Sequence, residues 1–338
     1  MINNMDFQKA VELIDKSSAI LVTTHIKPDG DACGSVAAMY DTLTALGKKV
    51  ELILPSELPE WYEFLFTEKP AILGQDVTFE QLKQGQFAQP DLLVLIDVNS
   101  NNQLPKFSEY LKQNDKPVLV LDHHITNDAL GSLELLDTTA AATALIVFDL
   151  LKYANWEITD KIAQALFVAL ATDTGWFRFS NTDSRVHLTT ALLIDAGANP
   201  SKIYHRLYQN FSPQRLKLMA VMLNSLELHF DGRFATQYLT QQDFLQTGAK
   251  YKDTENLIDE CQRISTVETA SLFVELADGR VKVSLRSRGA VDVCKIAAKF
   301  GGGGHTSAAG AHLPGPIEKA KKLILAEMAE QFKSPECK

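Results

Sequence analysis

The fold of this chain is decided by residues 19–35, which read A-I-L-V-T-T-H-I-K-P-D-G-D-A-C-G-S. Residues 20–23 are aliphatic or β-branched and do not alternate with polar residues, which is typical of a strand buried on both faces of a parallel sheet. The run ends in a loop that carries His25, Asp29 and Asp31. An imidazole and two carboxylates at one strand end are the arrangement of a metal site.

The charges of this loop favour a bound cation. Asp29 and Asp31 held together would repel, and one would take up a proton unless a cation lay between them. Carboxylate oxygens and an imidazole nitrogen suit manganese, iron, zinc or magnesium. Asp-Gly-Asp is also ordinary turn chemistry, so this loop alone leaves both interpretations open.

Two further apolar runs also end in acids or imidazoles. D-L-L-V-L-I-D ends in Asp97, and P-V-L-V-L-D-H-H ends in Asp122, His123 and His124. Helical patterns between the strands indicate β-loop-α-β units and therefore a parallel α/β sheet. Ligands of such sheets bind beyond the carboxyl ends of the strands, so these residues are expected to converge.

Helical patterns follow the first loop and precede Asp173. Gly34 and Ser35 are expected to open a helix after the first loop, and a helix over residues 159–172 precedes Asp173. Asp173 thus lies at a helix end, where the negative dipole disfavours an unneutralised carboxylate. A metal would resolve this conflict, although a solvent-facing Asp at a helix end is the alternative.

We predict an α/β protein with three parts. They are an N-terminal parallel-sheet α/β domain over residues 1–190, a helical connector over 191–225 and a smaller α/β domain over 226–338. The connector is indicated by helix starts at Asn199-Pro200 and Ser212-Pro213. In the last part, Asp231-Gly232 and Asp278-Gly279 predict hairpins, and a helix is expected over residues 253–264.

Composition limits the class of protein. The chain has 338 residues, 46% hydrophobic and 22% charged, which is ordinary for a soluble globular protein. Its four cysteines form no C-x-x-C pair and are expected to be reduced thiols. No membrane partner is expected, and the N-terminus lacks the pattern of a signal peptide, which predicts a cytoplasmic protein. The net charge of −9 argues against binding to long duplex nucleic acid.

A second group of candidates surrounds the run G-G-G-G-H-T-S-A-A-G near the C-terminus. Consecutive glycines let backbone N–H groups approach an anion, and the absence of G-K-[ST] excludes a P-loop. We predict a basic mouth that binds a substrate phosphate. Its residues are Arg286, Arg288, Gly302, Gly303, Gly304 and His305. A flexible loop with solvated arginines is the alternative.

Together these motifs resemble those of the DHH phosphoesterase superfamily. The resemblance is carried by H-I-K-P-D-G-D-A-C-G-S, the strand end at Asp97, D-H-H-I-T-N and A-T-D-T-G-W-F. The glycine run through His305 resembles the signature of the DHH-associated C-terminal domain. With this chain length, the combination is similar to the nanoRNase group of bifunctional oligoribonucleases and 3′-phosphoadenosine 5′-phosphate (PAP) phosphatases.

The resemblance implies two divalent metal ions, Mn²⁺ first, with Mg²⁺ or Co²⁺ as alternatives. One ion would be held by His25, Asp29 and Asp97, and the other by Asp31, Asp97, His123 and Asp173. Asp97, Asp122 and His124 would be the catalytic residues. Asp122 would orient His123, and His124 would face the substrate phosphate. Asn127 of the D-H-H-I-T-N motif would join the substrate-binding residues.

The chain departs from the family pattern at two places. The segment after Asp97 reads V-N-S-N-N-Q-L, with Gln103 near the position where members of this group often carry an arginine. Residues 140–143, A-A-A-T, lack the expected serines. Neither departure touches the expected metal ligands, so both concern substrate preference.

The expected activity is two-metal-dependent hydrolysis of short oligoribonucleotides to mononucleotides and of PAP to AMP. One alternative is a phosphodiesterase for linear or cyclic dinucleotides such as pApA, and another is a catalytically silent nucleotide-binding sensor. Trp176 and Phe177, close to Asp173, are candidates either for stacking on a base or for the core. A homodimer is compatible with the sequence.

Overall fold

The computed structural model describes residues 2–209, 211–289, 291–304 and 306–333. The chain forms two compact units, Met1–Asn210 and Phe211–Lys338. Helices α7 (Ser184–Asp195) and α8 (Pro200–Tyr208) belong to the first unit, and α9 (Pro213–Asn224) belongs to the second. The segment expected to be a connector therefore contributes to both units.

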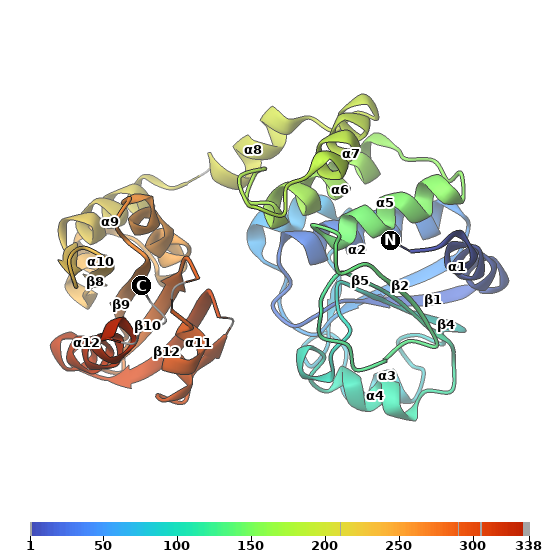
Figure 1. Ribbon diagram of the computed structural model, residues 1–338. Helices are drawn as coiled ribbons and strands as arrows, with labels where there is room; N and C mark the ends of the chain where they lie inside the picture. The colour runs from blue at the N-terminus through green and yellow to red at the C-terminus, as the bar shows by residue number, and fades with distance from the viewer. Residues whose placement is uncertain (1, 210, 290, 305, 334–338) are drawn as a thin grey trace. The chain divides into compact units, whose positions relative to one another are not determined.

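A six-stranded parallel sheet forms the centre of the first unit (Figure 1). Its strands are β1 (Ala19–Thr23), β2 (Lys49–Leu54), β3 (Ala71–Ile72), β4 (Leu92–Ile96), β5 (Val118–Asp122) and β6 (Leu133–Leu136). The strand order is β3-β2-β1-β4-β5-β6, so the direction of winding reverses between β1 and β4. Ligand sites of such sheets lie at this reversal, beyond the carboxyl ends of the strands. The predicted α/β class is confirmed.

Helices cover both faces of this sheet (Figure 1). On one face lie α1 (Asn4–Lys16), α2 (Gly30–Ala45), α5 (Thr143–Tyr153) and α6 (Asp160–Asp173), and on the other lie α3 (Phe79–Lys83) and α4 (Phe107–Gln113). In β1, Ile20 and Val22 belong to the first core and Leu21 to the second. Burial on both faces explains why the strand is apolar without alternation.

Helix α2 begins at Gly30, four residues before the predicted start at Gly34. The reason is Asp29, whose side chain accepts hydrogen bonds from the N–H groups of Asp31 and Ala32 and caps the helix. Asp31 therefore lies in the first turn of a helix and not in a loop.

Two glycines bring α2 against α6. A Cβ atom on Gly34 would lie 2.3 Å from the carbonyl oxygen of Ala165, and one on Gly30 would lie 2.2 Å from Oγ1 of Thr172. Only glycine permits such close packing. The first turn of α2 thus meets the last turn of α6, where Asp173 lies.

The second unit contains a mixed six-stranded sheet in the order β11-β12-β10-β9-β8-β7. Its strands are β7 (Glu227–His229), β8 (Phe234–Leu239), β9 (Thr269–Glu275), β10 (Arg280–Ser287), β11 (Gly303–Gly304) and β12 (Ala308–Pro314). Both predicted hairpins form, because β7 pairs with β8 and β9 pairs with β10 in antiparallel register. One core includes α11 (Val293–Ala298) and α12 (Ile317–Lys333), and another includes α9.

The predicted helix over residues 253–264 is wrong. This part of the chain forms two 3₁₀ helices, η3 (Tyr251–Thr254) and η4 (Leu257–Arg263). Asn256 between them has a left-handed backbone with φ 57°, which interrupts a right-handed helix. The remaining short elements are η1 (Glu60–Leu65), η2 (Asn101–Gln103) and α10 (Gln241–Thr247).

Among the described residues, no helix combines the length and the apolar character needed to cross a membrane.

Candidate metal centre

Six side chains converge beyond the carboxyl ends of β1, β4 and β5. They are His25, Asp29, Asp31, Asp97, His123 and Asp173, all named by the sequence as metal ligands. One group unites His25, Asp29 and Asp97, and a second unites Asp31, His123 and Asp173; ligand atoms within each group lie within 4.8 Å of one another. Donor sets of carboxylates and imidazoles at these separations fit divalent metal ions.

Asp97 belongs to the first group and also faces His123 of the second. Its Oδ2 atom is 3.5 Å from Nε2 of His25, and its Oδ1 atom is 3.6 Å from Nε2 of His123. His123 Nε2 also lies 3.8 Å from Oδ2 of Asp31 and 3.7 Å from Oδ2 of Asp173. The two oxygens of one carboxylate thus face different imidazoles, which is the arrangement expected of a residue that bridges two metal ions.

Backbone carbonyls set the orientation of both imidazoles. Nδ1 of His25 lies 2.9 Å from the carbonyl oxygen of Ile26, and Nδ1 of His123 lies 3.1 Å from that of Ala140. A carbonyl oxygen only accepts, so Nδ1 carries the proton in each ring and Nε2 keeps its lone pair. Both lone pairs are therefore available to a metal.

The backbone at Asp97 is unusual. Its φ of 59° lies in the left-handed region, and its N–H donates to the carbonyl oxygen of Leu121. Asp tolerates this conformation better than most residues, but it still costs free energy. The left-handed residue turns the chain at the end of β4 and is held there by β5.

Burial makes the cluster electrostatically unfavourable when it is fully ionised. Burial raises the pKa of Asp97 well above its ordinary value, and the charge of Asp31 raises it further. Burial also raises the pKa of Asp31, against the opposing effect of His123. For Asp173, burial and then Asp31 raise the pKa to about 8. A divalent cation would reverse this penalty, so the donor set fits a metal.

Helix α5 supports the cluster through groups that the sequence motifs do not indicate. The N–H of Thr143 donates to Asp31 Oδ2 at 2.6 Å, and the N–H of Ala144 donates to Asp31 Oδ1 at 3.1 Å. The hydroxyl of Thr143 donates to Asp97 Oδ1 at 2.8 Å, and Ser35 Oγ donates to Asp31 at 3.0 Å. Thr143 therefore contacts both carboxylates. Thr143 is the first residue of α5, and the free N–H groups at a helix N-terminus bind carboxylates, so the start of this helix was the signal that could have identified it.

The expectation that Asp122 orients His123 is wrong. Asp122 Oδ1 accepts from Nδ1 of His124 at 2.7 Å and from the N–H of the same residue at 3.2 Å. The turn after β5 places His124 against the Asp122 carboxylate, and Nδ1 of His123 donates instead to the carbonyl oxygen of Ala140. The hydrogen bond with Asp122 raises the pKa of His124 to about 9, although burial opposes the rise.

Two neighbouring segments hold the loops around the cluster. Asn127 accepts hydrogen bonds from Nδ2 of Asn99 at 3.0 Å and from the N–H of Ala129 at 2.6 Å, which closes its own loop. The carbonyl oxygen of Gln103 accepts from the N–H of Ile26 at 2.8 Å, next to His25. The substrate-binding role of Asn127 stays a prediction.

The predicted arginines of the second unit already have partners. Arg286 Nε donates to Asp259 Oδ1 at 3.0 Å. Arg288 donates to the carbonyl oxygens of Ser265 and Gln262. A substrate phosphate would have to share or replace these contacts, so the basic mouth remains a prediction.

The glycine run has a packing role. Gly303 and Gly304 pair with β12, and a Cβ on Gly302 would lie 2.1 Å from the carbonyl oxygen of Gly310. Gly304 has φ 144° and a Cβ there would lie 2.4 Å from the carbonyl oxygen of Ala308. These two positions need glycine for backbone packing, whether or not a ligand binds. His305 lies outside the described residues.

Two family models match the chain, one within each of its two units. Residues 19–172 match the model of the DHH family, N-terminal domain, and residues 231–334 match that of the DHHA1 domain. A relative from Thermus thermophilus named bifunctional oligoribonuclease and PAP phosphatase NrnA is 32% identical over 330 residues, which cover 96% of this chain and 92% of the relative.

Solved structures share the fold. An exopolyphosphatase-related protein from Bacteroides fragilis superposes with a TM-score of 0.89 at 23% identity, over 99% of both chains. RecJ in complex with Mn²⁺ from Thermus thermophilus gives a TM-score of 0.57 at 15% identity, over 98% of this chain and 55% of that one. At these identities the likeness concerns the fold alone.

Proposed function

This chain belongs to the DHH family, and from that premise we propose that it hydrolyses phosphoester bonds in short oligoribonucleotides and in PAP. The observation that supports the proposal most strongly is the position of Asp97, whose two oxygens face His25 and His123. The relative from Thermus thermophilus, 92% of whose length is covered, is named a bifunctional oligoribonuclease and PAP phosphatase. Short substrates also suit a chain whose net charge is −9.

Enzymes of this family depend on divalent metal ions. We propose two ions, Mn²⁺ before Mg²⁺ or Co²⁺, one held by His25, Asp29 and Asp97 and the other by Asp31, Asp97, His123 and Asp173. Bound there, they would supply Lewis acidity and lower the pKa of a water molecule. Manganese is placed first because the resemblance of the sequence motifs implies it.

The remaining residues would position these ligands and the substrate. Thr143 and the N-terminus of α5 hold the Asp31 and Asp97 carboxylates in place. Asp122 fixes His124 through Nδ1, which leaves Nε2 of this imidazole for a phosphate oxygen. A donor placed there would offset the negative charge that spreads over the phosphoryl oxygens in the transition state. No side chain has to act as a nucleophile.

In the second unit, Arg286, Arg288 and the amides of Gly302, Gly303 and Gly304 would bind another part of the substrate, together with His305. Arginine suits this role because its planar fork matches phosphate oxygens. Arg286 lies near the end of β10, opposite Ala308 of β12, and Arg288 follows that strand.

A substrate panel tests the proposal. Purified protein with Mn²⁺ is offered PAP, a linear dinucleotide, a five-nucleotide RNA and pyrophosphate, and the products are separated by chromatography. We expect AMP from PAP and mononucleotides from both oligonucleotides, with pyrophosphate left intact. Turnover of the dinucleotide alone would instead favour a dinucleotide phosphodiesterase. Bound metal without turnover of any substrate would favour a nucleotide-binding sensor and overturn the proposal.

The cytoplasmic location and the homodimer remain predictions from the sequence. Fractionation of the producing cells and sedimentation velocity of the purified protein test them directly.

A further inference from the structure

An aromatic cluster lies next to the candidate metal centre, on the side of Asp173. After α6 the chain passes through three consecutive left-handed residues, Gly175, Trp176 and Phe177, with φ of 56°, 57° and 62°. Bulky residues rarely adopt this conformation, and it costs free energy. The turn places two aromatic side chains directly after a predicted metal ligand.

The two aromatic residues of this turn differ in their surroundings. Both pack edge-on against Phe167, which is buried in the core of the first unit, with ring centroids 6.0 Å apart. Trp176 also contacts Tyr204 at 5.0 Å and Tyr208 at 5.6 Å. Trp176 therefore links the core to two tyrosines on a neighbouring helix. Of the two sequence alternatives, the core describes both residues, because each is partly buried against it.

Helix α8 presents these tyrosines at the surface. Tyr204 and Tyr208 are four residues apart, so they share one face of the helix, and their rings are 5.2 Å apart. Tyr204 is 43% exposed and Tyr208 is 37% exposed, whereas Ile203 and Leu207 of the same helix are buried. The helix thus packs through its aliphatic residues and leaves a pair of aromatic rings accessible.

Tyr62 connects this pair to the metal centre from the other side. Burial raises the pKa of the Tyr62 hydroxyl, and the nearby Tyr208, Cys33 and Asp29 raise it further. Tyr62 belongs to η1, which packs against both α8 and α2, the helix that the predicted ligand Asp29 caps. The cluster therefore adjoins the elements of the centre through η1 as well as through the turn after Asp173.

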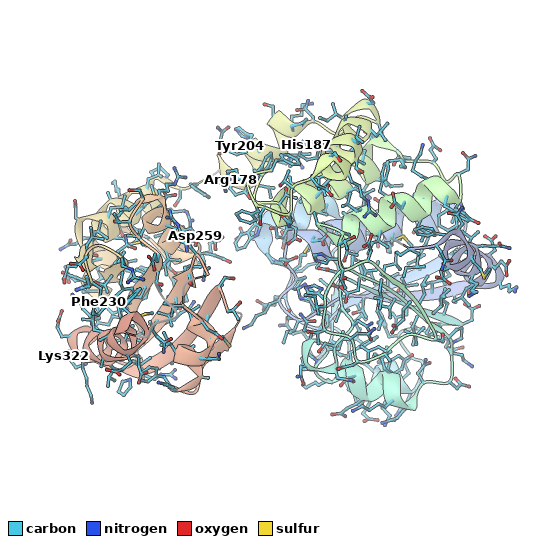
Figure 2. All side chains as sticks on the ribbon, in the orientation of Figure 1. Arg178, His187, Tyr204, Phe230, Asp259 and Lys322 are labelled. Carbon is cyan, nitrogen blue, oxygen red and sulfur yellow. The ribbon has the colours of Figure 1, made fainter. Side chains whose placement is uncertain are left out.

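Positive charge accompanies the aromatic rings. Arg178 is exposed, and its Nε donates to the carbonyl oxygen of Gly175 at 2.6 Å (Figure 2). Burial raises the pKa of the Tyr208 hydroxyl, and the charge of Arg178 partly opposes this rise. Arg206 of α8 lies over the ring of Phe64, 5.0 Å from its centroid. In a chain of net charge −9, cations beside accessible aromatic rings match a nucleotide, which offers a base and a phosphate.

We propose that Tyr204 and Tyr208, with Arg178, form a subsite for a nucleotide of an oligoribonucleotide beyond the scissile phosphate. Its base stacks on the tyrosine rings, and its phosphate accepts from the guanidinium. The subsite rests on the proposed function, because it assumes an oligonucleotide at the centre. PAP, which has one nucleoside, would occupy the metal centre without filling the subsite.

The test compares two double variants. Tyr204→Leu with Tyr208→Leu removes both aromatic rings, while Tyr204→Phe with Tyr208→Phe keeps them. Tyr153→Leu is the matched control, because Tyr153 is 41% exposed and stacks on Phe7 on another helix. Circular dichroism and thermal unfolding establish that each variant folds.

The first readout is the ratio of kcat/KM for a five-nucleotide RNA to kcat/KM for PAP. Stacking of one base predicts that the leucine variant lowers this ratio on the order of 10- to 100-fold through KM, while the phenylalanine variant retains it. The Tyr153→Leu control should leave the ratio unchanged. An equal loss for both substrates, or no change in the ratio, would overturn the proposal.

The second readout does not depend on turnover. Anisotropy of a fluorescein-labelled five-nucleotide RNA, measured in EDTA against the same RNA with abasic riboses, gives the contribution of the bases to affinity. We expect the wild type to prefer the RNA with bases and the leucine variant to lose that preference. Failure of the proposed function would leave this result intact. A leucine variant that changes only the sedimentation coefficient would mean that the tyrosines cover a protein contact, and would refute the subsite.

Discussion

The two groups of predicted site residues differ in how their charges are already balanced. In the first unit, the ion-pair partners of Asp31 and Asp97 among the described residues are histidines, and burial raises the pKa of both carboxyl groups. In the second unit, Arg286 has a carboxylate partner in Asp259, and Arg288 has two carbonyl partners. The predicted ligands of the first group include more carboxylates than imidazoles, whereas the arginines of the second group already have acceptors.

This difference indicates which group is built around a ligand. Like charges are gathered in a buried place only when something else compensates them, since each unpaired buried carboxylate costs free energy. Arginines that already have partners stabilise the fold with or without a substrate. We therefore expect large effects from changes in the first unit and small effects from changes in the second.

The largest effect should come from Asp97→Asn. Asparagine keeps the size and tolerates the left-handed φ of 59°, so the backbone is preserved better than by alanine. The change removes the charge that faces both His25 and His123, and kcat/KM for PAP should fall on the order of 10³-fold or more. Steady-state kinetics measures this, with circular dichroism as the control for folding. Substantial remaining activity would show that Asp97 does not bridge two metal ions.

The second prediction concerns how the stability of the metal-free protein depends on pH. Burial raises the pKa of Asp173 to about 8, against about 3.9 for an unfolded Asp. Between these values the native state keeps a proton that the unfolded state has released, so the unfolded state binds fewer protons. The free energy of unfolding of the metal-free protein should therefore fall as pH rises from 5 to 8, on the order of 1–3 kcal/mol.

Urea denaturation at both pH values in EDTA measures how the free energy of unfolding changes with pH. His124, with its pKa raised to about 9, contributes a further decrease in the same direction. Mn²⁺ at a hundred times its Kd should add about 2.7 kcal/mol at pH 8. Asp173→Asn should flatten the slope, while Asp115→Asn, a change on the exposed surface, should leave it unchanged. Stability that rises with pH in EDTA would contradict the electrostatic description of the centre.

The third prediction concerns Thr143→Val. Valine has nearly the same shape but no hydroxyl, so Asp97 loses one hydrogen bond while the backbone N–H bonds to Asp31 remain. Affinity for Mn²⁺, measured by isothermal titration calorimetry, should fall about 10- to 100-fold. Thr139→Val removes a comparable hydroxyl, from Asp137 and outside the centre, and serves as the control. Equal Mn²⁺ affinity in both variants would remove Thr143 from the supporting set.

The sequence predicted which side chains converge better than it predicted the groups that support them, for a physical reason. Asp97 and His123 follow buried strands, and parallel strands bring their ends to one edge, so position along the chain implies position in space. Thr143 acts partly through its backbone N–H, a group that every residue except proline has and that no motif identifies. The partner of Asp122 depended on the turn after β5, which a strand pattern does not specify.

The smallest effect should come from Asp259→Asn in the second unit. Asp259 accepts from Arg286 Nε at 3.0 Å, and its charge competes with any phosphate for the same guanidinium. Asparagine keeps an oxygen acceptor but removes the charge. If Arg286 binds substrate, the variant should lower KM for PAP by about two- to fivefold, because an exposed ion pair contributes only about 0.2–1 kcal/mol.

Arg286→Gln should raise KM by a similar factor. Asp278→Asn, which alters the exposed pair with Arg280, is the matched control. Opposite changes in KM for Asp259→Asn and Arg286→Gln would support a substrate role for the arginine, whereas losses of stability without a change in KM would identify the pair as purely structural.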